Sequence, residues 1–288
     1  MWRSRRPRRS RKGGAAEMTT HHGWLGRVFG SGDAGGNHTA IVGQGFDMAR
    51  APALAKRLGV PDTGFLTELS DRRVTLRTFS PYEELEQCFQ TSLAVLSALN
   101  VPEGETWEVS HAEGDRLEVV REPEMTWAVP SLAGRPRLEP VPVPANIKGK
   151  GRAAVLRQAR SRLHVRLEDL AHVNAVDLTP GQVLDLCAEH QAAGVVISGP
   201  VEDRSIRVRV FTSSLGGAED SATGGAVIGV GILESVDGVR GDVVATQGPE
   251  DAARQGRLGL RISGPYEVGL GGASRTIMEG EFRVGGAR

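Results

Sequence analysis

The sequence predicts an α+β fold built from two similar halves. Short segments that alternate apolar with polar residues, or are β-branched, predict strands in both halves, and each half contains one helix of small and apolar residues. Strand ends Phe79 and Phe211 and helix starts Thr91 and Thr223 share one offset of 132 residues (211−79 and 223−91). A common offset favours duplication of a strand, turn and helix unit; chance agreement is the alternative.

Composition fits a globular chain whose first residues differ from the rest. With 288 residues and 39% hydrophobic content, the chain can fill the core of one large domain or two ordinary ones. Residues 1 to 12 hold seven basic side chains and no acid, so the remainder is mildly acidic. We expect residues 1–17 to be a disordered basic tail; the alternative is an arm that binds nucleic acid or a membrane surface.

Several classes of partner are disfavoured. Aromatic residues make up only 5% of the chain, which argues against a stacking surface for nucleic acid. No window approaches the roughly 20 apolar residues that span a bilayer. Two cysteines, Cys88 and Cys187, are too few for a disulfide framework or a metal cluster, so we expect a cytoplasmic protein without a metal site.

Residues 18–130 are predicted to form the N-terminal domain. Asp47 can cap a helix that ends at Gly59, and the nearly all-apolar segment Thr91 to Leu99 predicts a buried helix. The predicted strands are Gly23 to Phe29, Thr39 to Val42, Phe65 to Leu69, Arg73 to Phe79, Thr106 to Val109, Leu117 to Glu122 and Met125 to Val129.

A proline-rich stretch separates this domain from the next. Five prolines between Pro130 and Pro144 predict a linker over 131–144, followed by a C-terminal domain over 145–274. In that domain a small-residue helix follows Thr223. The other predicted elements are a helix from Pro180 to Ala193 and strands Ala153 to Leu156, Val195 to Ser198 and Ile206 to Phe211.

The starts of the two buried helices are candidate binding positions. Free backbone N–H groups and the positive helix end favour anions there, so two facing starts could clamp a carboxylate. The alternative is that small residues merely allow close packing. The residues concerned are Gln90, Thr91 and Ser92 in the first half and Thr223, Gly224 and Gly225 in the second.

Two acids, Asp62 and Asp220, lie near these turns. A carboxylate in a partly apolar cleft has a raised pKa and becomes a usable proton carrier. Helix caps or surface acids are the alternative interpretation, so spacing alone leaves their role open.

Four motifs resemble the PhzF-like family of phenazine biosynthesis. Gly35 to Val42 resembles the family's GNPAAVV segment, and Leu76 to Ala94 resembles LRxFTPxxEL…CGHxTLA. Glu219 to Ala226 resembles EDPATGSA, and Thr246 to Glu250 is similar to QGxEMGRPS. The motifs occur in the family's order over roughly residues 24 to 286.

This resemblance implies a fold and a chemistry. Each of two domains would be a curved β-sheet or barrel wrapped around a central α-helix, with the active-site cleft between them. A C-terminal strand near residues 275–288 would join the N-terminal domain, and two chains would form a homodimer. Family members move protons on small carboxylic acids without a metal or organic cofactor.

The resemblance also assigns site residues. Asp62 matches the catalytic glutamate of the family, and Asp220 matches its aspartate. The family's Gly-His pair is replaced by Phe89-Gln90, and the Gln90 amide can orient a substrate but cannot transfer protons near neutral pH.

Three further positions belong to the implied substrate site. Asn37 and His38 lie in a turn that borders the family's cleft. Cys88 matches a catalytic cysteine of racemases that share this fold; with only Ser221 in the partner turn, we expect it to be a wall residue.

These observations predict a cofactor-independent isomerase that shifts a double bond in a small unsaturated carboxylate or amino acid. Similar isomerases act on alkyl-proline precursors of lincosamide and pyrrolobenzodiazepine antibiotics, which makes secondary metabolism the expected setting. Two alternatives stay open: a catalytically silent protein that binds a small molecule, and an epimerase that uses Cys88.

Overall fold

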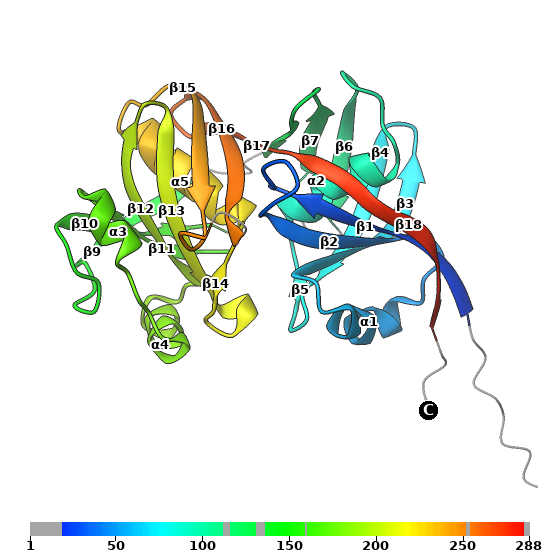
Figure 1. The fold of residues 1–288 in the computed structure, drawn as a ribbon, viewed down its shortest axis with the longest axis horizontal. Coiled ribbons are helices and arrows are strands. Elements are labelled where there is room, and N and C mark those ends of the chain that lie inside the picture. Colours follow the sequence, from blue (N-terminus) through cyan, green and yellow to red (C-terminus); the bar gives the residue numbers. More distant parts are fainter. Residues whose placement is uncertain (1–18, 112–115, 131–135, 159, 252–253, 285–288) are drawn as a thin grey trace, which may run out of the picture.

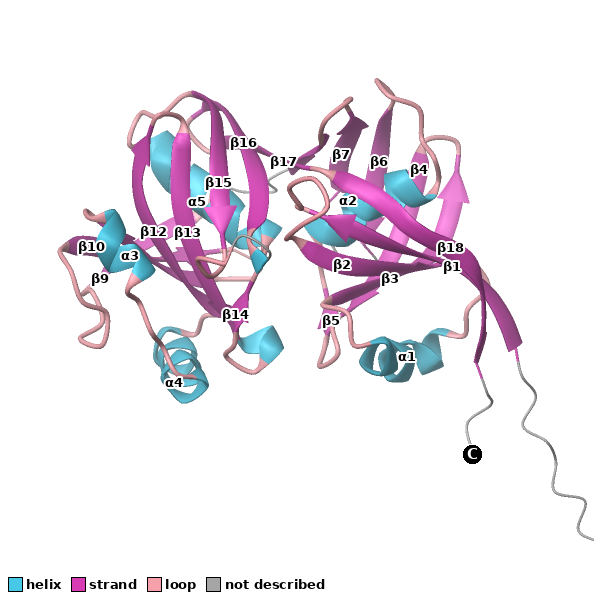
Figure 2. Cartoon of the chain, viewed as in Figure 1, coloured by secondary structure: helices cyan, strands magenta, loops and turns pink. Residues whose placement is uncertain are grey.

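The computed structural model describes residues 19–111, 116–130, 136–158, 160–251 and 254–284. The chain forms two similar halves, each a curved sheet around one buried helix (Figures 1 and 2). The α+β prediction is therefore confirmed. The expected basic tail over 1–17 and residues 131–135 of the expected linker lie outside the described residues.

The N-terminal half wraps its sheet around helix α2 (Phe89–Ala98). Neighbouring strands follow the order β18, β1, β2, β3, β4, β6, β7, β8. The 3₁₀ turn Met48–Arg50 and helix α1 (Ala51–Leu58) precede β3. The strands are β1 (Thr19–Val28), β2 (Asn37–Val42), β3 (Asp62–Ser70), β4 (Arg73–Phe79), β5 (Glu84–Leu85), β6 (Thr106–His111), β7 (Arg116–Arg121), β8 (Thr126–Pro130) and β18 (Ser274–Val284).

The C-terminal half repeats this plan around helix α5 (Gly224–Val236). Helices α3 (Leu170–Asn174) and α4 (Pro180–His190) lie outside its sheet, and a 3₁₀ turn spans Ser213–Leu215. The strands are β9 (Arg137–Val141), β10 (Gly151–Arg157), β11 (Arg162–Leu167), β12 (Gly194–Glu202), β13 (Ser205–Thr212), β14 (Glu219–Asp220), β15 (Gly241–Gln247), β16 (Gly256–Gly264) and β17 (Glu267–Gly272).

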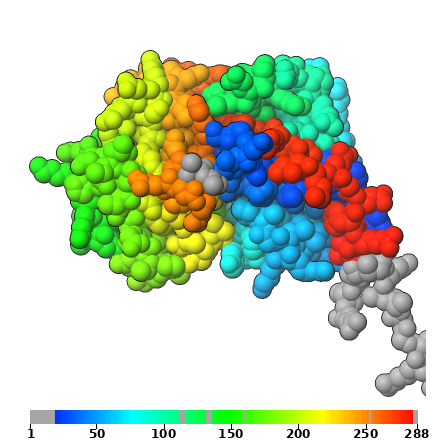
Figure 3. All heavy atoms as spheres, in the orientation of Figure 1, coloured from blue at the N-terminus to red at the C-terminus, as the bar shows by residue number. Residues whose placement is uncertain are grey.

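Strand directions show that the halves are equivalent. In the first half β2 runs parallel to β3 and β4 to β6; in the second, β11 runs parallel to β12 and β13 to β15. The halves join where β8 pairs with β17, with Ala128 opposite Leu270. β18 then crosses back and pairs with β1 along the surface of the N-terminal half (Figure 3).

One hydrophobic core runs through both halves. It contains the buried faces of both sheets together with α2 and α5, including Leu93 and Val227. All ten residues of α2 are buried, because the sheet surrounds the helix. Smaller clusters pack α1 and α4 against the outer sheet faces. None of the described helices has the length and apolar character to cross a membrane.

The helix starts differ from the predicted ones. Helix α2 begins at Phe89, two residues before Thr91, and Cys88 is its N-cap; α5 begins at Gly224 with Thr223 as N-cap. Cys88 and Thr223 are therefore the equivalent pair, separated by 135 residues (223−88), while Phe79 and Phe211 keep the 132-residue offset. The difference arises because Phe211 pairs with Glu219, eight positions later, whereas Phe79 pairs with Glu84, five positions later.

Part of the predicted linker is a strand. β9 pairs with β10, and Pro140 lies opposite Ala154, so residues 137–141 belong to the C-terminal sheet. Proline is tolerated because β9 is an edge strand, where a missing N–H costs no ladder bond on the open side. The linker predicted from proline content therefore includes residues that belong to a strand.

The two central helices approach each other at their starts. A Cβ added to Gly224 would lie 2.7 Å from the Cβ of Phe89 and 2.7 Å from Leu270 Cδ2. Real Cβ atoms do not approach carbon that closely, so only glycine fits. This contact sets how far apart the halves stand at the place where both helices begin.

We predict that Gly224→Ala lowers the free energy of unfolding by about 1–3 kcal/mol, because the added methyl group overpacks this contact. Thermal or urea unfolding measures the change. Gly181→Ala is the matched control: a Cβ there meets nothing within 4 Å, and alanine favours the first turn of α4. Equal stability of the two variants would contradict the packing argument.

Candidate active site

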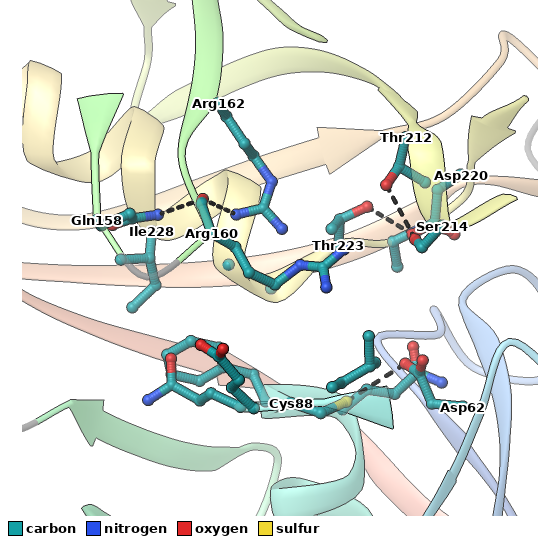
Figure 4. A pocket seen from close by; sticks show the side chains of 18 of the residues that line it. Asp62, Cys88, Gln158, Arg160, Arg162, Thr212, Ser214, Asp220, Thr223 and Ile228 are labelled. Atoms are coloured by element: carbon teal, nitrogen blue, oxygen red, sulfur yellow. Dashed lines mark hydrogen bonds between the residues drawn. The ribbon is translucent and has the colours of Figure 1, made fainter. Parts of the chain in front are cut away.

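A cavity of about 130 Å³ lies between the two halves, at the starts of α2 and α5 (Figure 4). Its walls combine acids, two arginines and apolar side chains. The lining includes Asp62, Leu85, Glu86, Cys88, Phe89, Gln90, Arg160, Arg162, Asp220, Thr223, Gly224, Gly225 and Ile228.

Asp62 is the first residue of β3 and faces the cavity from the N-terminal half. Burial, followed by the charge of Asp220, raises the pKa of Asp62 to about 7. A hydrogen bond from Cys88 and the charge of Arg160 act in the opposite direction. A carboxyl group with this pKa can both hold and release a proton near neutral pH.

Cys88 contacts the same carboxyl group. Its Sγ lies 3.3 Å from Asp62 Oδ2, and it accepts the N–H of Thr91 as the cap of α2. Burial and the Asp62 charge raise the pKa of the Cys88 thiol well above its ordinary value. The thiol is therefore protonated at neutral pH and donates to Asp62.

Asp220 enters the cavity from the C-terminal half, on β14. Its side chain accepts hydrogen bonds from Asn37 Nδ2 (2.9 Å) and from the Thr223 hydroxyl. Burial raises the pKa of Asp220, and these hydrogen bonds to the ionised form oppose the rise. The two acids thus face one space from different halves, in different polar surroundings.

Gln247 holds the turn that carries Asp220. Its Nε2 donates to the Asp220 carbonyl and to Thr223 Oγ1, both at 3.0 Å, and its Oε1 accepts the Thr223 N–H at 3.0 Å. The side chain is fully buried. Gln247 belongs to the Thr246 to Glu250 motif, yet its place at the site was not predicted.

Asn37 and Gln90 connect the halves. Asn37 Nδ2 donates to Gln90 Oε1 (3.1 Å) as well as to Asp220, and Gln90 Nε2 donates to Thr39 Oγ1. Gln90 lines the cavity, but both ends of its amide are occupied by protein partners. The residue in place of the family histidine therefore braces the cleft.

Four residues expected to bind substrate do not line the cavity: Asn37, His38, Thr91 and Ser92. His38 is exposed, since alternation along β2 turns its side chain outward between two buried neighbours. The hydroxyls of Thr91 and Ser92 point back to the Cys88 carbonyl. Direct substrate contact by these four therefore stays a prediction.

The other expected residues do meet in one place. Asp62, Cys88, Gln90, Asp220, Thr223, Gly224 and Gly225 all line the cavity. The position that faces Cys88 by symmetry is Thr223, so the expected pairing with Ser221 is corrected. A threonine hydroxyl that donates to Asp220 is not a base, and a two-cysteine arrangement is absent at this pair of caps.

The sequence analysis did not predict Arg160 and Arg162 as site residues. Arg162 is the first residue of β11 and Arg160 lies just before it. Arg160 Nη2 donates to Glu83 of the other half at 2.8 Å. No motif marked them, because alternating arginines before a strand ordinarily face solvent. Within the described part of the chain, no three His, Cys, Asp or Glu side chains are placed to hold a metal ion.

Comparison with known proteins agrees with this fold. The family model PhzC-PhzF, phenazine biosynthesis-like protein, matches residues 27–280. A PhzF family protein of Bacillus anthracis is similar in structure, with TM-score 0.75, 15% identity, and coverage of 92% of this chain and 99% of that one. No protein with a curated description matches the sequence.

Epimerases share the fold as well. A predicted epimerase from Pseudomonas aeruginosa has TM-score 0.73 and 22% identity, covering 91% of this chain and 99% of that one. A hydroxyproline epimerase from Agrobacterium vitis, with bound trans-4-hydroxy-L-proline, has TM-score 0.60 and 12% identity, covering 93% and 92%. At these identities the likeness concerns the fold.

We predict that Asp62→Asn unfolds at a higher temperature than wild type at pH 8. Because the pKa of Asp62 is raised in the folded state, the free energy of unfolding of the wild type falls as pH rises from about 4 through about 7. Asparagine does not ionise, so the variant escapes this loss. The gain should shrink toward pH 4, where wild type is protonated in the folded state.

Thermal scans across this pH range measure the effect, with Asp47→Asn at the exposed cap before α1 as control. A pH-independent effect of Asp62→Asn would show that its carboxyl is not the buried acid described above.

Proposed function

The chain belongs to the phenazine biosynthesis-like PhzC-PhzF family, and from that premise we propose that it is an isomerase that moves a proton on a small carboxylic acid without a cofactor. The observation that carries this proposal is the pair of acids on opposite walls of one cavity. Asp62, with a pKa of about 7, is poised to exchange a proton with a substrate, and Asp220 approaches from the other half.

Each acid has a distinct role in the proposed reaction. Ionised Asp62 removes a proton from a carbon beside the double bond, and the resulting acid returns it at another carbon or to the same one. Asp220, fixed by Asn37 and Thr223, is placed to relay a proton on the opposite side of the substrate. Cys88 donates to Asp62 in the resting state and so orients its carboxyl group.

The cavity limits the size and character of the substrate. Its volume of about 130 Å³ admits only a small molecule. Apolar side chains of Phe89 and Ile228 line it beside the charged groups, which suits an unsaturated carbon skeleton with one polar end. An alkyl-proline precursor of an antibiotic is a narrower proposal within this class.

The epimerase alternative has less support from the site. Its thiol base would have to ionise, but burial and the neighbouring charge of Asp62 hold the pKa of Cys88 far above neutral pH. A silent binding protein remains the other alternative, because Gln90 stands in place of the family histidine. The two retained acids favour catalysis over it.

We predict that wild type incorporates deuterium from heavy water into small β,γ-unsaturated acids, beginning with but-3-enoate, as followed by NMR. Asp62→Asn and Asp220→Asn should each slow the exchange by about 10²- to 10⁴-fold, because asparagine keeps the shape of aspartate but lacks the carboxylate that carries the proton. Gln90→Ala should have a smaller effect, mainly a higher KM, because Gln90 braces the cleft and does not carry a proton. Asp71→Asn, at an exposed turn, is the control.

Circular dichroism would verify that each variant is folded. Exchange by both aspartate variants at the wild-type rate would refute the assigned roles. A wild type that exchanges none of the acids would favour the binding protein instead.

We predict that kcat/KM rises with pH through about 7, because Asp62 must be ionised to accept a proton. A ¹³C titration of the Asp62 carboxyl should show the same midpoint, displaced to lower pH in Asp220→Asn, where the repelling charge is gone. A midpoint unchanged by Asp220→Asn would show that the two acids do not interact.

A further inference from the structure

Arg162 is a buried charge without an acidic partner. Only 5% of the residue is exposed, and no carboxylate of the described residues lies within ion-pairing distance of its guanidinium. Its Nη1 donates to the Arg160 carbonyl at 3.1 Å, while its Nε has no partner. Burial and the charge of Arg160 lower the pKa of Arg162 to about 10, and the charge of Asp220 opposes them, so the group is still charged at neutral pH.

A second buried arginine shows what full pairing looks like. Arg209 donates from Nε and Nη2 to Glu219 and from Nη1 to backbone carbonyls, among them that of Asn174. An unpaired buried charge is costly, and truncating one partner of such a pair is strongly destabilising. Arg162 makes no such direct ion pair with a described residue, and Asp220 acts on it only through its charge, so a ligand anion at the guanidinium would complete its pairing.

The position of Arg162 coincides with the start of α5. A Cβ added to Gly225 would lie 3.3 Å from Arg162 Nη1 and 3.5 Å from Nη2, so glycine leaves room for the guanidinium over the first turn. The side chain points from the C-terminal half into the cavity (Figure 4). The first-turn N–H groups of Gly224 and Gly225 have no intrahelical acceptor, as in any α-helix.

The two helix starts are not equivalent as anion sites. The Cys88 sulfur accepts a first-turn N–H of α2, whereas the Thr223 side chain makes no capping bond to α5 and donates to Asp220 instead. Asp62 and the thiol of Cys88 lie on the α2 side, whereas Asp220 on the α5 side is already bonded to Asn37 and Thr223. An anion is accordingly favoured at α5, beside Arg162.

We propose that Arg162 and the first turn of α5 bind the carboxylate of the substrate, which leaves the rest of the molecule directed at Asp62. The inference rests on the proposed function. It places the substrate carboxylate on the C-terminal half and the proton acceptor on the N-terminal half. Arg162 would then select acids over their uncharged amides.

The test compares crotonate with crotonamide, which have the same skeleton and differ in charge. The ¹H–¹⁵N resonance of Arg162 Nε, identified by its loss in Arg162→Lys, should shift saturably with crotonate, and crotonamide should bind at least about tenfold more weakly. Arg162→Met should weaken crotonate binding by at least about tenfold. Arg152→Met, on an exposed arginine paired with Asp237, should bind as wild type does.

Stability supplies an independent readout. Arg162→Met should unfold at the same temperature as wild type or higher, because it removes an uncompensated buried charge. Arg166→Met should unfold at a lower temperature, since it leaves the buried Glu234 without its cation.

Each failure has a distinct meaning. The inference is overturned if crotonate and crotonamide bind alike, if crotonate does not shift the Arg162 resonance, if Arg162→Met keeps full affinity, or if Arg162→Met is destabilised. Arg162-dependent binding without deuterium exchange on any acid would refute the proposed function alone. Exchange that needs Asp62 but not Arg162 would refute this inference alone.

Discussion

The contact between Phe89 and Gly224 is the constraint on which the site depends. It brings two buried helix starts into one space, where the first N–H groups of each helix have no intrahelical acceptor. Cys88 supplies one for α2, while Asp220 and Gln247 organise the turn before α5. The polar groups that could carry chemistry are therefore the same groups that make the meeting of the halves possible.

Charge is distributed unevenly around this space. The charge of Asp220 adds to the cost of ionising Asp62, and Arg162 makes no direct ion pair within the described part of the chain, so this cavity is less stable than a fully paired or apolar one would be. A ligand that carries one negative charge and yields one proton relieves both costs. Such a site gives up folding stability in exchange for a reactive arrangement.

The sequence predicted the duplicated fold and part of the cavity wall, because glycine, threonine and acid motifs lie at fixed places in a repeated unit. It did not predict that the His38 side chain faces outward on β2. Nor did it predict that the Gln90 amide is bonded to Asn37 and Thr39. Arg162 was missed for a related reason. Whether an arginine is buried without an acid depends on long-range packing, which no local pattern records.

The return of β18 to the N-terminal half has a consequence for synthesis. The first half makes most of its contacts early, but the outer partner of β1 is the last described strand of the chain. During synthesis β18 leaves the ribosome after the whole second half. One edge of β1 therefore stays unpaired while the residues up to β18 are made. An open strand edge is a site for wrong pairing, and the nascent chain must keep this one shielded until β18 has been made.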